Sequence, residues 1–98
     1  MHMSHYIILG NWTEEGIRNV KDAPRRIENT RRMIEESGGK MQLFYTLGEH
    51  DFVLVVDAPN DETMMKNLLS LGSLGNVRTT TLKAWTESEG AKVIAQMS

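Results

Sequence analysis

Two segments of this chain carry apolar side chains on both faces of an expected β-strand, which restricts the folds open to it. Residues 6–12 are rich in β-branched and aromatic side chains, and residues 52–56 form an unbroken apolar run. A strand with one face in water alternates apolar and polar residues instead. These two segments are therefore expected in the centre of a sheet, with a cover on each face.

The other two strands are expected at the edges of that sheet. Residues 40–47 alternate between apolar and polar side chains, which is typical of a strand with one buried face. Residues 77–85 are polar in the middle, where three threonines follow one another. The expected apolar side of the first of these strands consists of Met41, Leu43, Tyr45 and Leu47.

Helix signals follow the first strand. Thr13 is a typical N-cap, Pro24 suits the first turn of a second helical segment, and the glycines after Ser37 end that segment. Spacings of three, four and seven residues predict that both segments share one buried stripe. That stripe comprises Ile17, Val20, Pro24, Ile27 and Ile34.

A further helix is expected over residues 59–71, and Thr86 with Glu89 forms a capping box for a C-terminal helix. The resulting order of elements predicts an α+β, ferredoxin-like βαββαβ fold with a four-stranded antiparallel sheet. Right-handed crossovers place the first and third strands in the centre, in agreement with their apolar character. The whole chain, residues 1–98, forms one domain, in which residues 1–4 are expected to be disordered or a cloning remnant.

In this fold both helices cover one face of the sheet, so the apolar side chains of the opposite face need another cover. About 600 Å² of apolar surface would otherwise meet water, more than soluble monomers usually expose. We expect a second copy to stack its sheet on the first, giving a twofold homodimer, with higher oligomers left open. The alternative is that the C-terminal helix folds back over this face.

Charge argues against a nucleic-acid binder. The net charge is −2 and the pI is about 5.9, whereas phosphate binding needs an excess of Lys and Arg. The arginines of the long helix alternate with glutamates at three- and four-residue spacings, a pattern typical of a solvated, ion-paired face. These arginines are Arg25, Arg26, Arg31 and Arg32.

The composition also excludes several kinds of functional site. The chain has no cysteine, which excludes disulfides and thiol ligands, and its histidines lack the spacing of a metal motif, so neither a metal nor a cofactor is expected. No apolar run approaches the roughly 18 residues of a membrane span, and no signal peptide opens the sequence. A cytoplasmic protein without membrane contact is the simplest expectation.

The chain resembles the GYD-domain family over nearly its whole length. The resemblance is carried by the turn at residues 48–51 and by the run at residues 71–82, together with residues 6–10, 13–17, 38–40 and 58–62. His50 stands where the family has a tyrosine, so an aromatic hydroxyl is absent from that position. The resemblance implies a small protein of the dimeric α/β barrel group, with no established activity for the family.

His50 and Asp51 are the neighbouring pair in the sequence that best suits acid–base catalysis. An imidazole beside a carboxylate can act as a general base, with Tyr45 or Arg78 polarising a substrate. The alternative is structural: Gly48 and Asp51 are ordinary turn residues, with His50 solvated at the tip of the turn.

Trp12 and Trp85 end neighbouring strands, and we expect them to stack at one mouth of the space between sheet and helices. Together with Met65 they are candidates for contact with an apolar ligand; packing in the core is the alternative.

Two hypotheses for the function follow. The first is a homodimeric module without catalysis, structural or binding a small apolar ligand. The second is a small cofactor-free monooxygenase or isomerase whose apolar or aromatic substrate lies between sheet and helices, surrounded by Tyr45, His50, Asp51 and Arg78. An amino-acid-sensing domain is a third option, which would lack its own DNA-binding part.

Overall fold

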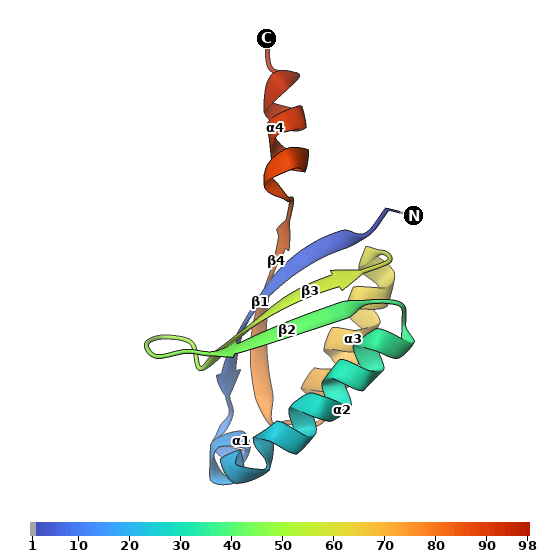
Figure 1. Ribbon diagram of the computed structural model, residues 1–98. Coiled ribbons are helices and arrows are strands. Elements are labelled where there is room, and N and C mark those ends of the chain that lie inside the picture. Colours follow the sequence, from blue (N-terminus) through green and yellow to red (C-terminus); the bar gives the residue numbers. More distant parts are fainter. Residues whose placement is uncertain (1) are drawn as a thin grey trace.

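The computed structural model describes residues 2–98, and it has the expected order of elements (Figure 1). Met1 lies outside the described residues. The elements are β1 (Ser4–Trp12), α1 (Glu14–Arg18), the 3₁₀ turn η1 (Val20–Asp22), α2 (Ala23–Glu36), β2 (Lys40–Tyr45), β3 (Phe52–Ala58), α3 (Asp61–Ser73), β4 (Val77–Ala84) and α4 (Glu87–Ala95).

The four strands form one antiparallel sheet in the order β2-β3-β1-β4. The two segments that are apolar on both faces, β1 and β3, therefore lie in the centre, and the α+β ferredoxin-like prediction is confirmed. β1 begins at Ser4, which pairs with Ala58, so the disorder expected for residues 1–4 does not extend to that residue.

The local signals for helix ends also hold. The Thr13 side chain accepts a hydrogen bond from the Gly16 backbone N–H at 3.0 Å. Gly38 follows α2 with φ of 91°, the left-handed conformation that suits glycine at this position. Thr86 and Glu89 form the expected capping box at the start of α4.

α2 and α3 cover one face of the sheet, and the core lies beneath them. Ile8 of β1 pairs with Leu54 of β3, and both are buried there with Ile34 of α2 and Met64 of α3. Because side chains alternate along a strand, every second residue of β1 and β3 belongs to this layer. No helix of the described chain is long and apolar enough to cross a membrane.

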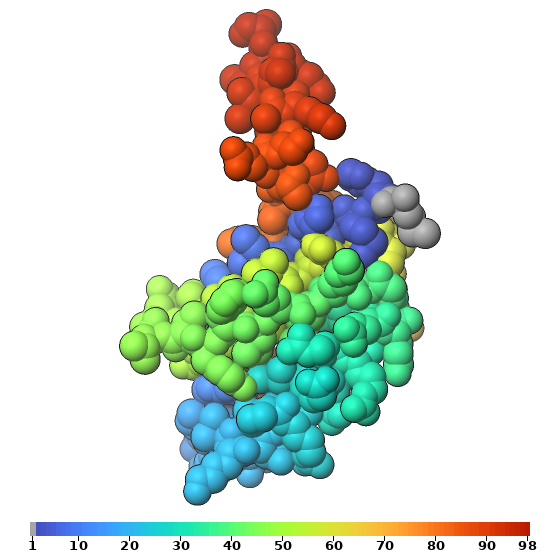
Figure 2. All heavy atoms as spheres, viewed as in Figure 1, coloured from blue at the N-terminus to red at the C-terminus, as the bar shows by residue number. Residues whose placement is uncertain are grey.

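Nothing in the described part of the chain covers the opposite face of the sheet (Figure 1). We call it the open face; it carries the alternate set of β1 and β3 side chains, together with Phe44 from β2 and Leu82 from β4. α4 does not fold back over it, but extends away from the body of the molecule (Figures 1 and 2). The apolar centre of the open face comprises Ile7, Leu9, Val53, Val55, Phe44 and Leu82.

Two sequence expectations about burial are wrong. Ile17, Val20 and Pro24 are exposed, and Gly16 and Ala23 are the buried residues of this region. The break in helical geometry at η1 changes the rotational phase between α1 and α2, so one stripe cannot run through both. On β2, Tyr45 and Leu47 are exposed because the strand ends at Tyr45 and extends beyond the helices.

Gly16 is buried because α1 touches the turn before β4. A Cβ atom at this position would lie 2.0 Å from the Asn76 carbonyl oxygen, which itself accepts a hydrogen bond from the Thr13 backbone N–H at 3.1 Å.

We expect Gly16→Ala to lower the free energy of unfolding by about 1–3 kcal/mol through overpacking. Urea unfolding measures this. Gly72→Ala in α3 is the control: its Cβ meets nothing within 4 Å, so it should be neutral or slightly stabilising. Equal effects of the two changes would contradict the packing at Asn76.

Tyr6 anchors the start of α3 to the sheet. Its hydroxyl donates to Asp61 Oδ1 at 2.5 Å, and Lys83 Nζ contacts both oxygens of the same carboxylate at 2.8 and 2.9 Å. Burial, followed by the hydrogen bond to Asp61, raises the pKa of Tyr6 to about 12, while Lys83 and then Tyr6 lower that of Asp61.

The pKa of Tyr6 is higher in the folded protein than the ordinary value of 10.0. The protonated Tyr6 hydroxyl therefore contributes fully to the free energy of unfolding below pH 10, and this contribution decreases as the pH rises toward 12. We expect urea unfolding between these pH values to show a steeper loss of stability in the wild-type protein than in Tyr6→Phe. Parallel losses in the two proteins would contradict this assignment.

Candidate functional site

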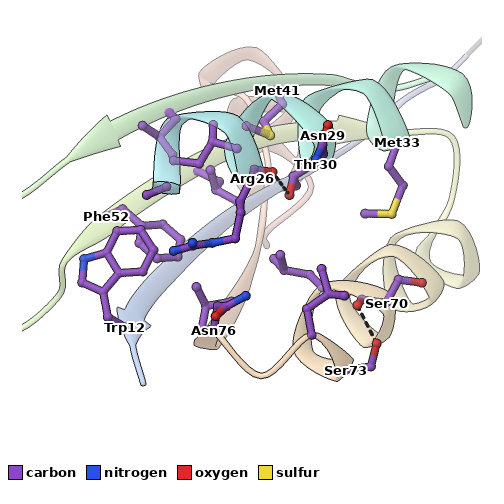
Figure 3. Close-up of a pocket in the computed structure, with 17 residues that line it drawn as sticks. Trp12, Arg26, Asn29, Thr30, Met33, Met41, Phe52, Ser70, Ser73 and Asn76 are labelled. Carbon is purple, nitrogen blue, oxygen red and sulfur yellow. Dashed lines mark hydrogen bonds between the residues drawn. The ribbon is translucent and has the colours of Figure 1, made fainter. Parts of the chain in front are cut away.

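A cavity of about 410 Å³ lies between the sheet and the helices (Figure 3). This volume is within the range of small-molecule sites. The sheet contributes its floor, α2 forms one wall, and the end of α3 with the turn before β4 forms the other. Most of its lining is apolar, including Met33, Met41, Leu43, Phe52, Leu54 and Leu71.

Trp12 and Phe52 close one end of the cavity. Their ring centroids are 5.1 Å apart and the planes are tilted by 46°, a favourable aromatic arrangement. Gly10 makes room for Phe52, since a Cβ atom there would lie 2.1 Å from the ring. The absence of a side chain in the middle of β1 therefore determines where this aromatic wall lies.

Arg26 is the charged residue among the described residues that line the cavity. Its side chain is only 19% exposed, and it reaches from α2 toward Trp12 and Phe52 (Figure 3). Nη1 donates to the Asn19 carbonyl oxygen at 3.0 Å and lies 3.8 Å from Asp22 Oδ2. Nη2 is buried and has no hydrogen-bond partner among residues 2–98.

Two hydroxyl groups that line the cavity donate within their own helices. Thr30 Oγ1 donates to the Arg26 carbonyl oxygen at 3.0 Å, and Ser73 Oγ donates to the Ser70 carbonyl oxygen at 2.7 Å. The arrangement therefore combines apolar walls with one buried cationic donor that has unused hydrogen-bonding capacity.

The candidate pair His50 and Asp51 lies outside this cavity, and each contacts β1. His50 Nδ1 is 3.0 Å from Asn11 Oδ1, and Asp51 Oδ2 accepts from the Trp12 backbone N–H at 2.9 Å. Within residues 2–98 no hydrogen bond or ion pair joins the two side chains. The Asp51 carboxylate and its backbone N–H, which donates to the Gly10 carbonyl at 2.8 Å, hold the turn onto the end of β1.

The other two residues of the proposed catalytic set are also outside the cavity. Tyr45 is exposed at the end of β2, where it pairs with Phe52. Arg78 is exposed on β4 opposite Asn11, on the open face. The structure thus brings His50 and Arg78 to opposite sides of Asn11. The four proposed catalytic residues do not surround one common cavity.

The expected stacking of Trp12 on Trp85 is wrong. β1 and β4 are antiparallel, so Trp12 pairs with Val77 at the start of β4, while Trp85 follows Ala84 at the far end. Trp12 lines the cavity, whereas Trp85 and Met65 are exposed and do not.

Sequence reasoning missed Arg26, which it assigned to a solvated face. Arg25 does belong to such a face, pairing with Asp22 at 2.6 Å, and Arg31 lies 3.6 Å from Glu28. The spacing in the sequence could have indicated this position. Arg26 is next to Ile27 and four residues before Thr30, so it lies on the side of α2 that faces the sheet. No group of three or more potential metal-ligating side chains occurs in the described part of the chain.

The βαββαβ order of the main elements, with an antiparallel sheet of order β2-β3-β1-β4 and both long helices on one face, defines the ferredoxin-like class of α+β domains. Within this class, the GYD-domain family model matches residues 6–94, and the chain belongs to the GYD-domain family. The resemblance seen in the sequence is thereby confirmed.

Proteins similar to the chain include a curated relative and a solved structure. A Thermus thermophilus protein named glutamine synthetase and cystathionine beta-lyase binding protein is 33% identical over 84 residues, which is 84% of this chain and 88% of that protein. The crystal structure of MtbAldR matches with a TM-score of 0.61 at 20% identity, covering 87% of this chain. The chain spans about half, 55%, of the MtbAldR chain, and this likeness concerns the fold alone.

Proposed function

We propose that this protein is a homodimeric binding module without catalysis, which pairs through its open face, binds another protein and holds a small ligand in its cavity. The single observation that carries the pairing is the uncovered apolar centre of the open face. A cytoplasmic location remains a prediction from the sequence.

The layout of the open face favours a second copy as its cover. Its apolar centre is flanked by polar groups: His5 and Asp57, 2.6 Å apart, lie toward one end, and Arg78 lies toward the other. In a twofold stack the apolar centres meet each other and the charged ends stay at the rim. Val55, Leu82 and Phe44 are 40%, 47% and 50% exposed in one copy, so pairing would remove these apolar side chains from water.

The relative from Thermus thermophilus supports the protein-binding part of the proposal. Its name describes the binding of two enzymes, and its length and sequence match this chain almost from end to end. A small domain whose function is to associate with enzymes needs exposed recognition surface more than catalytic groups. α4 projects from the body with Val93 and Ile94 exposed, and Met97 is exposed just beyond its end; this segment provides such surface in addition to the open face (Figure 2).

The cofactor-free enzyme hypothesis loses its structural basis. It required Tyr45, His50, Asp51 and Arg78 to surround the space between sheet and helices, and none of the four lines the cavity. The groups that do line it include no general base of the carboxylate or imidazole type.

Val55 tests the pairing. It lies at the centre of the open face and is 40% exposed in one copy, so a lysine there can be accommodated in a monomer but not between two sheets. We expect Val55→Lys to shift the protein from dimer to monomer at micromolar concentration in sedimentation equilibrium. Leu69→Lys is the control, because Leu69 is 65% exposed and belongs to α3 on the other side of the sheet. A wild-type protein that sediments as a monomer would refute the pairing.

The protein-binding part is tested with purified enzymes from the same genome. We expect immobilised wild-type protein to bind glutamine synthetase or cystathionine beta-lyase saturably in biolayer interferometry, with serum albumin as the control protein. Absence of binding to both enzymes, in a protein that still dimerises, would refute this part of the proposal and leave the pairing intact.

A further inference from the structure

We infer that the cavity binds a small monocarboxylate with an apolar, preferably aromatic, body and no ammonium group, and that the guanidinium group of Arg26 donates to the carboxylate. This inference rests on the small-ligand part of the proposed function. It does not depend on the pairing, because the cavity and the open face lie on opposite faces of the sheet.

The buried donor of Arg26 is the first argument. A buried polar hydrogen without an acceptor is unfavourable, and nearly all such groups in folded proteins find a partner. Nη1 of this guanidinium is satisfied by the Asn19 carbonyl oxygen, while Nη2 is not. The Thr30 hydroxyl group, one turn along α2, donates to the Arg26 carbonyl oxygen. A rotation of the guanidinium toward a ligand acceptor in the cavity would complete the hydrogen bonding of Nη2.

The balance of charge is the second argument. Asp22 is the carboxylate near Arg26, but it is 3.8 Å from Nη1 and is held more closely by Arg25, at 2.6 and 3.2 Å. No Asp or Glu lines the cavity among the described residues. An anionic ligand therefore gains a charge-assisted hydrogen bond that a neutral ligand of the same shape lacks.

The same lining argues against an α-amino acid. A carboxylate side chain is the usual partner of a ligand ammonium group, and the cavity presents none. Burying an unpaired ammonium group beside a guanidinium is unfavourable on both counts of desolvation and repulsion.

The apolar lining selects the body of the ligand. Trp12 and Phe52 present aromatic surfaces next to Arg26, and Met33 and Met41 can adjust their flexible side chains to an irregular shape (Figure 3). A phenyl or branched aliphatic group linked to a carboxylate by a short chain fits these surfaces.

Trp12 provides the readout. The chain has two tryptophans, so Trp85→Phe leaves the cavity residue as the sole indole. We expect hydrocinnamate to change the Trp12 fluorescence of this full-length protein saturably. Hydrocinnamyl alcohol, which lacks the charge, and phenylalanine, which adds the ammonium group, should each bind at least about tenfold more weakly. Equal affinity for the acid and the alcohol, or no fluorescence change at millimolar hydrocinnamate, would overturn the inference.

Matched variants assign the effect to Arg26. In the Trp85→Phe background, Arg26→Gln should abolish the preference for the acid over the alcohol, whereas Arg32→Gln, an exposed arginine of the same helix, should retain it. A preference that survives in Arg26→Gln would place the carboxylate elsewhere and overturn the assignment. Val55→Lys should still bind hydrocinnamate, so loss of pairing and loss of ligand binding are read separately.

Discussion

A single helical layer covers a sheet whose two central strands are apolar on both faces, and the other features of the molecule depend on this imbalance. On the covered side, Ile8, Leu54 and Val56 pack against α2 and α3 to form the core. The helices do not fill all of the space above the sheet, and the cavity lies in the unfilled part beside Phe52. On the other side, no described segment of the chain covers Val55 and its neighbours. The sheet thus has one face covered by helices, with a cavity for a small ligand, and one exposed apolar face that is available to a second copy.

The parts of the fold that follow from local chemistry could be predicted from the sequence. Thr13 and Thr86 cap their helices because a hydroxyl two or three residues before free backbone N–H groups satisfies them, whatever lies nearby. The positions of the strands in the sheet followed from the fact that a strand apolar on both sides is stable only between neighbours and covers. The uncovered face followed from the same argument, since two helices on one side leave the other side bare.

The candidate site could be predicted less well because its members come together through register and helix rotation. Trp12 and Trp85 were expected to meet, but an antiparallel pair separates residues that end both strands. Arg26 was grouped with exposed arginines, although one step of about 100° around α2 separates it from Arg25. Gly16 carried no signal at all: its importance comes from the Asn76 carbonyl oxygen, which approaches from a segment sixty residues later in the chain. His50 and Asp51 look chemical as neighbours in sequence, yet each is directed toward its own partner on β1.

α4 has nine residues and meets the rest of the molecule mainly through Glu89, which lies 3.5 Å from His5 Nε2. A helix this short has too few internal hydrogen bonds to persist alone in water, where roughly 12–15 residues are needed even for favourable sequences. A partner surface that covers Val93 and Ile94 would therefore stabilise α4 as a helix as well as bury apolar side chains.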